Sequence, residues 1–546
     1  MSRRAWVLSA IGFALVTRVM TAPLIDLNNL SDASYPGDAR LLIWTLAWDA
    51  HALLTHVPLF DANMFFPQAG ALGWAEHHIG LGLFATPVYA LTHDPVYAYW
   101  CVWLAAFVLN GLAMQALAFR ITKDAVASFG AGLLYAFCFF RMHHAHGHVQ
   151  MLWTWAMPLA LLAADRWVER PSAGRTAGVV AAVVLQALSG WYLAVDLAII
   201  LVVAAPFLLL KRPLTLRHLA SGAVAVAIAV PAILWFAGAY THLAGNSLAE
   251  VQGNSADIAS YLVPPENTRL GQWVATHTSL KPRWIWGEQT LYLGLVGVLL
   301  AGLGKWRWLR TPDRLTAAAA MAGGVGLALS FGPGTHGHLP FDVFTKLPAM
   351  GLLRAPARFA LLVVFAQAVL VAGGAAWLRR HWRRPATLAL TALAAFGLWE
   401  SYVINFPGGT PPREPIPAVY TRLKSLPAGA VLSLPTYRFA PDNFHEADYL
   451  LFSTAHWHPI VNGFGRHEPP GHMARMETLR HFPSPDAMAT LRSTGVRYVV
   501  LHPARASELA RAADEAAHLA GVHLVAHDGD DFLFEIDQNP SHQGVN

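Results

Sequence analysis

The sequence contains little charge and almost no cysteine. Charged residues make up 13% of the 546 residues, about half the share that is usual in soluble proteins. The two cysteines, Cys101 and Cys138, both lie in apolar stretches, which excludes a disulfide framework in the exposed parts. No stripe of basic and aromatic residues and no nucleic-acid-binding module is seen, so nucleic acid is not an expected partner.

Long apolar runs are abundant instead. Hydrophobic residues make up 55% of the chain, and its mean hydropathy is +0.39. Because a membrane-spanning helix needs about 20 mostly apolar residues, the sequence predicts an α-helical polytopic membrane protein with about 11 spans. The expected spans are 5–25, 96–119, 124–140, 149–168, 174–189, 191–210, 218–239, 289–304, 315–331, 357–378 and 386–404.

Basic residues set the orientation of these spans. Loop Lys and Arg accumulate on the cytoplasmic side, and with a cytoplasmic N-terminus the inner loops hold eighteen of them against eight outside. The apolar stretch 79–91 is too short to cross, so we expect a re-entrant or interfacial helix within a first outer loop, 26–95. Arg18 interrupts the first apolar run and no clean cleavage site follows, so this run is expected to stay as an anchor.

The composition changes after residue 404. Prolines mark a linker, and the apolar runs shorten to strand length at 431–434, 496–501, 522–525 and 532–536, with a helical pattern at 504–519. We therefore expect a membrane domain, 1–404, and a soluble α/β domain, 405–546, on the periplasmic side of a bacterial inner membrane. The linker prolines are Pro407, Pro411, Pro412, Pro415 and Pro417.

Carboxylates gather in the first outer loop, where few basic residues accompany them. Acidic groups beside a bilayer are costly, and their clustering suggests proton transfer or metal binding. The acidic residues of this loop are Asp26, Asp32, Asp38, Asp49, Asp61 and Glu76.

Several short motifs in this layout resemble the glycosyltransferase C superfamily, and more closely a bacterial group within it. Gly37-Asp38-Ala-Arg40 matches the acidic position near the start of that superfamily's first outer loop, and 67–91 matches the loop's second half. The other recurrent motifs are Trp48-Asp49-Ala-His51, Phe60-Asp61-Ala-Asn63, Phe66-Pro67, Glu76-His77, Tyr292-Leu-Gly294 and Arg354-Ala-Pro-Ala-Arg358-Phe.

The resemblance implies a membrane glycosyltransferase that takes a sugar from a polyprenyl-phosphate carrier and passes it, with inversion, to a periplasmic or cell-envelope acceptor. Protein O-mannosyltransferases and aminoarabinose transferases often carry adjacent acidic residues where this chain has Gly37-Asp38, so the acceptor class stays open. The alternatives are a lipid-linked sugar transporter, for which internal halves and midplane charges are typical, and a non-catalytic assembly protein for envelope polysaccharide.

Inverting transfer needs a base for the acceptor proton and cations for the departing phosphate. Asp38, on which the resemblance falls, is the candidate base; otherwise it is the N-cap of a helix over 40–54. Asp49 lies about three helical turns further on, too far to pair with Asp38, and is expected at the surface or in contact with the acceptor. Glu76 is the second catalytic candidate. Glu76 and His77 both precede the stretch 79–91. They are expected to contact the substrate or a metal ion, or else to cap this helix.

The second outer loop is rich in histidine. Arg141, His144 and His148 are candidate contacts for the carrier's phosphate. His144, His146 and His148 are also candidate ligands of a divalent cation, although their spacing is not diagnostic of a metal site.

Arg354 and Arg358 would lie one turn apart on one helix face if the tenth span begins before Pro356. A pair of guanidinium groups at the outer bilayer surface suits a lipid-linked phosphate. Interfacial snorkelling is the alternative. We expected Asp38, His144, His148 and Arg358 to face one cavity.

Overall fold

A computed structural model describes residues 1–26, 30, 37–210, 212–279, 288–334, 340–404, 413–438 and 442–538. The chain forms two compact units. The first, which we call the helical unit, comprises Met1–Leu27 and Cys101–Thr410; the second, the mixed unit, comprises Asn28–Trp100 and Pro411–Asn546. Asp32, Pro407, Pro411 and Pro412 lie outside the described residues.

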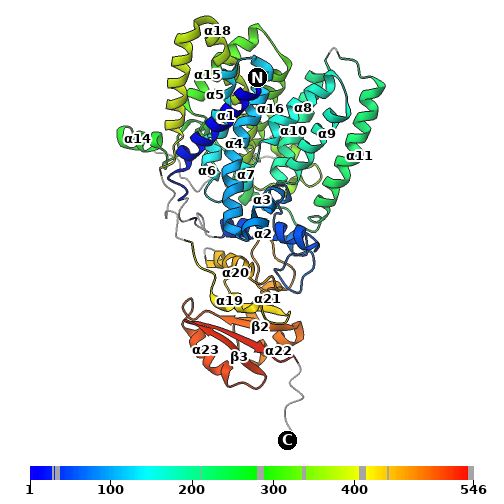
Figure 1. Cartoon of the computed structure of the whole chain (residues 1–546), viewed down its shortest axis with the longest axis vertical. Coiled ribbons are helices and arrows are strands. Elements are labelled where there is room, and N and C mark those ends of the chain that lie inside the picture. Colours follow the sequence, from blue (N-terminus) through cyan, green and yellow to red (C-terminus); the bar gives the residue numbers. More distant parts are fainter. Residues whose placement is uncertain are drawn as a thin grey trace. The chain divides into compact units, whose positions relative to one another are not determined.

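Every span expected from the sequence overlaps a helix (Figure 1). Within the described part of the chain, six helices are long and apolar enough to cross a membrane, while the full count of eleven spans stays a prediction. The helices are α1 (Arg3–Thr21), α4 (Pro95–Thr122, whose first residues belong to the mixed unit), α5 (Ala125–Ala136), α6 (Phe139–His144), α7 (Val149–Leu152), α8 (Ala156–Glu169), α9 (Ala173–Ala187), α10 (Trp191–Leu209), α11 (Leu216–Gly238), α12 (Leu248–Gly253), α13 (Ile258–Leu262), α14 (Arg269–His277), α15 (Leu295–Arg310), α16 (Arg314–Ser330), α17 (Pro340–Phe344), the 3₁₀ turns η2 (Met350–Leu352) and η3 (Pro356–Phe359), and α18 (Ala360–Glu400).

The helix α18 turns back on itself, although its residues are helical throughout. A straight helix of its length would place Gln367 and Glu400 roughly 50 Å apart. Yet the Gln367 side chain donates to the Leu293 carbonyl at 2.7 Å, and the Glu400 carboxylate accepts from the backbone N–H of Leu295 at 2.9 Å. The turn lies near Pro385, so α18 supplies both helices that the sequence predicts at 357–378 and 386–404.

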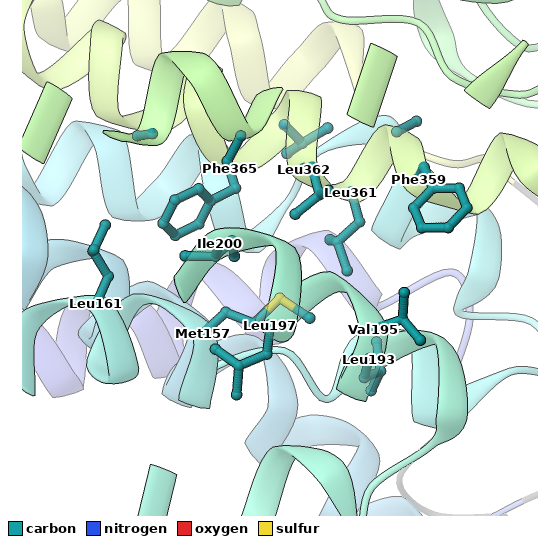
Figure 2. Close-up of a cluster of buried hydrophobic side chains, with 14 of the residues drawn as sticks. Met157, Leu161, Leu193, Val195, Leu197, Ile200, Phe359, Leu361, Leu362 and Phe365 are labelled. Carbon is teal, nitrogen blue, oxygen red and sulfur yellow. The ribbon is translucent and has the colours of Figure 1, made fainter. Parts of the chain in front are cut away.

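The core of the helical unit lies where α8 and α10 meet α16 and the first half of α18. Figure 2 shows side chains from α8, α10 and α18, among them Leu161, Ile200, Leu362 and Phe365, gathered in one buried cluster. Between helices that cross a bilayer, such a cluster stabilises the fold through close van der Waals packing, because lipid tails are as apolar as these side chains. This packing fixes the start of α18, which carries Arg358 just before it.

The basic loops that the predicted topology places on one side of the membrane lie close together in the structure. Arg120 and Arg314 both bind Asp165, which is fully buried, with shortest distances of 2.9 and 2.5 Å. Arg120, Arg314 and Arg212 also lie within ion-pair distance of Glu169. The loops after α4, α8, α10 and α15 therefore share one end of the helical unit, as the predicted alternation requires.

The mixed unit contains helices around a four-stranded sheet. Its strands run β1-β2-β4-β3, with β1 and β2 parallel and the other two pairs antiparallel. All four predicted strands and the helix expected at 504–519 are confirmed. The elements are α2 (Asp38–Thr55), η1 (Ala71–Trp74), α3 (Ile79–Thr92), α19 (Ala418–Leu423), β1 (Ala430–Leu434), η4 (Asp442–His445), α20 (Glu446–Ser453), α21 (His472–Leu479), α22 (Pro485–Thr494), β2 (Val496–Leu501), α23 (Glu508–Ala517), β3 (Val522–Asp528) and β4 (Asp531–Ile536).

The first loop packs with the C-terminal segment, whereas chain order had suggested that it belongs with the membrane helices. The backbone N–H groups of Phe65 and Phe66 donate to Asn462 and Ile460, at 3.0 and 2.9 Å, and the N–H of Ile460 donates back to Asn63 at 2.6 Å. Trp44 and other residues of the loop also share a buried core with the sheet. Backbone pairing and a common core explain why residues 28–100 and 411–546 form one unit. The helix predicted at 79–91 is present as α3.

Candidate functional site

The candidate base Asp38 is the first residue of α2 and is half-buried. The N-cap of this helix is Gly37, with a φ of 89°, so the expectation that Asp38 might itself be the cap is wrong. A Cβ at Gly37 would lie 2.6 Å from the ring of Phe444, so both the backbone conformation and the space require glycine here. An acidic residue in the first turn suits the positive end of the helix dipole.

Two residues further on, Arg40 ties α2 to the C-terminal segment. Its buried guanidinium pairs with Asp448 on α20 and with Glu414 at 2.9 Å. Arg505 binds the same two carboxylates, at 2.6 and 3.0 Å. Burial opposes ionisation of Asp448, but a hydrogen bond from His445 and the two arginines hold the pKa of its carboxyl below the usual value. This network fixes the first turn of α2, and with it the position of Asp38.

Asp49 is fully buried, so the expectation that it lies at the surface is wrong. Its carboxylate is hydrogen-bonded to Nε2 of His77, which is also fully buried. The carboxylate lies directly over Gly82 of α3, where any Cβ would collide with it. Asp49 and His77 therefore join α2 to α3, and contact of either residue with substrate is not supported by this packing. Glu76, the second catalytic candidate, is half-buried beside them.

Arg141, expected to contact the donor's phosphate, is fully buried in the helical unit. Its guanidinium donates to the Tyr135 carbonyl and to the Thr154 hydroxyl, the latter at 2.5 Å, and stacks on the Tyr135 ring. Thr154 in turn donates to Asn110 on α4 at 2.8 Å. These contacts give Arg141 a structural role in holding the turn between α5 and α8, so it is not retained as a donor contact.

The histidines of the second loop cluster at the end of α6 and in the turn that leads to α7. The ring centroids of His144 and His148 are 5.4 Å apart, and those of His146 and His148 are 6.0 Å apart. His146 Nδ1 is hydrogen-bonded to the His143 carbonyl. Among the residues that the structure describes, no group of three metal-ligating side chains is found, so the arrangement gives no support to a metal site at His144, His146 and His148.

Arg358 and Glu288 form a buried ion pair next to these histidines. Their side chains are 5% and 14% exposed, and the guanidinium donates through Nε at 3.1 Å and through Nη2 at 2.6 Å. Burial alone would raise the pKa of Glu288, but the charge and hydrogen bonds of Arg358 hold it well below its usual range. His144 Nε2 lies 3.8 Å from the same carboxylate. Neither ring nitrogen of His144 has a hydrogen-bond partner in the described part of the chain.

Arg354 does not pair with Arg358, contrary to expectation. The helical segment begins at Pro356, so Arg354 precedes it, outside any helix. Its side chain is 38% exposed and lies 3.6 Å from Glu250. The two arginines therefore have different environments, and Arg358 is the one held beside the histidines.

The residues Glu288, Asp448 and Arg505 were not found from the sequence. Glu288 had one visible signal, because it is a lone acidic residue close before the Tyr292-Leu-Gly294 motif. Arg40 appeared in the sequence only as the last residue of the Gly37-Asp38-Ala-Arg40 motif, with no role of its own. The candidate residues divide between the units: Asp38, Glu76, Asp49 and His77 belong to the mixed unit, and Arg141, His144, His146, His148, Arg354 and Arg358 to the helical unit.

Among solved structures, the chain is similar to the arabinofuranosyltransferase AftD from Mycobacteria, with 16% identity and a TM-score of 0.57. The likeness covers 99% of this chain and 40% of AftD, so this chain spans well under half of that enzyme's length. ArnT from Cupriavidus metallidurans, solved with undecaprenyl phosphate, matches over the whole of both chains with 14% identity and a TM-score of 0.47. The oligosaccharyltransferase from Archaeoglobus fulgidus matches with 12% identity and a TM-score of 0.46, over 91% of this chain and 70% of that one. No curated protein matches.

The chain shares its fold with AftD, which agrees with the resemblance to the glycosyltransferase C superfamily seen in the sequence. The chain belongs to the family described as Domain of unknown function (DUF6311), whose model matches residues 12–400. The matched range includes both candidate residue clusters, the one around Asp38 and the one around Arg358.

Proposed function

We propose that this protein is an inverting membrane glycosyltransferase that moves a sugar from a polyprenyl phosphate to a cell-envelope acceptor. The observation that carries the proposal is the likeness to an arabinofuranosyltransferase over 99% of the chain, with a TM-score of 0.57. In this proposal Asp38 takes the proton of the acceptor hydroxyl, and the oxygen then attacks the anomeric carbon as its bond to phosphate breaks. Glu76 is the second candidate for the base.

Two features of the helical unit support a lipid-phosphate donor. The first is the Arg358 guanidinium beside His144, whose ring nitrogens have no partner in the described residues. Such an unpartnered, buried imidazole next to an arginine suits the oxygens of a phosphate. The second is an apolar cavity, partly open, among α5, α15 and α18. Its apolar walls suit a prenyl chain.

Turnover of the donor tests the proposal directly. The full-length chain, reconstituted in lipid, is expected to consume at least one member of a panel of polyprenyl phosphates that carry radiolabelled arabinose, mannose or glucose. Label should pass from the lipid fraction to a cell-envelope extract supplied as acceptor. Consumption no greater than that of heat-inactivated protein, for every donor in the panel, would contradict the proposal.

We further propose that residues 405–546 are periplasmic and the N-terminus is cytoplasmic. The eighteen-to-eight asymmetry of basic residues supports this orientation, and so does the meeting of Arg120, Arg212 and Arg314 at one end of the helical unit. A C-terminal alkaline phosphatase fusion is expected to be active, and a green-fluorescent fusion at the same position dark. The reverse pair of results would overturn the orientation.

A further inference from the structure

The mixed unit contains a second cleft, beside α20 and α21, that has no part in the proposed chemistry. It is a small cleft, partly open to solvent, and is lined by residues 436–438, by residues of η4, α20 and α21, and by the segment before α21. Its polar lining includes Glu446, Glu468 and His472, and its apolar lining includes Phe464 and Met473. A few convergent polar groups among apolar side chains are typical of small-ligand sites.

Two buried polar side chains lie at this cleft. Glu446 is 4% exposed, and its carboxyl accepts from the backbone N–H of Tyr437 at 2.7 Å and from the Asn462 amide at 2.9 Å. His472 is also 4% exposed, and its Nδ1 has no hydrogen-bond partner in the described part of the chain. An orphaned buried nitrogen is costly unless a ligand or water completes it. His472 is thus a buried polar side chain in the cleft lining whose hydrogen bonding a bound water or ligand would complete.

The cleft has almost no net charge. Burial raises the pKa of Glu446 to about 8, so its carboxyl is mostly protonated at neutral pH. Arg438 pairs with Glu477 at 3.0 Å, and Arg480 lies 3.5 Å from the same carboxylate. Glu468, with a pKa raised by burial, offsets the second arginine. The lining therefore offers hydrogen-bond donors and acceptors without attracting a strongly charged ligand, which suits the hydroxyl groups of a neutral sugar.

The cleft also borders the start of α2. The ring of Phe464 in the cleft packs 6.0 Å from that of Phe444, and Phe444 is the residue that closes over Gly37. The helix α20 connects the two places as well, because it carries Glu446 in the cleft and Asp448 at Arg40. Both contacts lie within the mixed unit, so the cleft and the candidate base Asp38 are held by the same elements.

We infer that this cleft binds a neutral sugar residue of the acceptor glycan. That this sugar belongs to the acceptor rests on the proposed function. Binding of the sugar itself can be tested without any donor. Glu468 and His472 hydrogen-bond the hydroxyl groups, and Phe464 and Met473 cover the apolar face of the ring. Glu446 holds the cleft in shape through Tyr437 and Asn462.

Binding should be measured with the full-length chain in lipid nanodiscs, since many detergents carry sugar head groups. The probes are short fluorescent arabino-, manno-, gluco- and galacto-oligosaccharides. At least one is expected to bind saturably, and Glu468→Gln and His472→Ala should each weaken its binding about tenfold or more. Glu508→Gln, an exposed carboxylate on α23 of the same unit, is the matched control and should bind like the wild type. Glu446→Gln is a poor probe, because its new amide would face that of Asn462.

The inference is overturned if the wild type binds none of the probes, or if both cleft variants bind as well as Glu508→Gln. Donor turnover, measured separately, reports on the proposed function. Turnover without any sugar binding would overturn the cleft assignment alone. The protein could instead bind a sugar, lose that binding in both variants and consume no donor. This result would support the cleft as a glycan site and overturn only its link to transfer.

Discussion

Asp38→Asn is expected to abolish sugar transfer, with a loss of at least about 100-fold, the lower end of what general-base catalysis contributes. Asparagine keeps the size of the side chain and removes its basicity. Stability should change little, because Asp38 occupies the first turn of α2 and a charge there contributes about 0.3–1 kcal/mol. Expression, melting temperature and turnover of the labelled donor measure the two effects separately.

Asp61→Asn is the matched control for this experiment. Asp61 is an exposed carboxylate of the same loop, and its Oδ1 accepts from the N–H of Gly70 at 2.7 Å, which an asparagine can still do. Near-normal turnover by Asp38→Asn would reduce Asp38 to a helix-stabilising residue and make Glu76 the next candidate. A transporter or a non-catalytic assembly protein also predicts that Asp38→Asn keeps its function, so the variant distinguishes these classes from a transferase.

Local structure was predictable from the sequence because local patterns determine it. Runs such as 496–501 and 532–536 have the apolar and β-branched composition of buried strands, and the structure has β2 and β4 there. The apolar runs that suggested spans became helices for the same reason. The break between α7 and α8 at 153–155 was missed, because the apolar pattern continues across it. Composition alone therefore gave the elements but not all their boundaries.

Partners distant in sequence were not predictable. Arg40 and Asp448 are 408 positions apart, and no sequence pattern around either residue indicates that they pair. Asp49 was expected at the surface or at the acceptor because it lies about three helical turns from Asp38, yet Gly82 of α3 lets that helix approach closely enough to bury it. Likewise, Arg354 and Arg358 have the spacing of one helical turn, but Pro356 starts the helical segment between them. Each error came from treating a spacing or a composition as a contact.

Removal of the Arg358 side chain is expected to have the largest effect on both stability and donor use. Arg358→Ala leaves Glu288 buried without its counter-charge, which typically costs about 3–5 kcal/mol. The single variant is therefore expected to melt at a lower temperature or to express poorly, and its loss of activity would not identify a donor contact. The sequence did not reveal this cost, because it did not reveal Glu288 as the partner of Arg358.

The double variant Arg358→Gln with Glu288→Gln separates the two roles. It replaces the buried ion pair by two neutral side chains that can still hydrogen-bond, and such replacements are often close to neutral for stability. If Arg358 contacts the donor's phosphate, loss of one charge-assisted hydrogen bond costs about 1.5–3 kcal/mol, or about 10- to 150-fold in donor use. Glu288→Gln alone keeps the guanidinium, so it should retain more donor use than the double variant.

Arg354→Ala, at a half-exposed position, should weaken donor use without lowering the melting temperature.

Lys346→Ala provides the control for charge, since Lys346 is an exposed basic residue shortly before the same helix. It should leave donor use unchanged. The decisive measurement is the dependence of turnover on donor concentration, because a lost phosphate contact shows as weaker donor use in a protein that melts like the wild type. If the double variant melts normally and uses the donor as well as Lys346→Ala does, Arg358 is structural. The donor phosphate must then bind elsewhere in the helical unit or through residues outside the Arg358–His144 cluster.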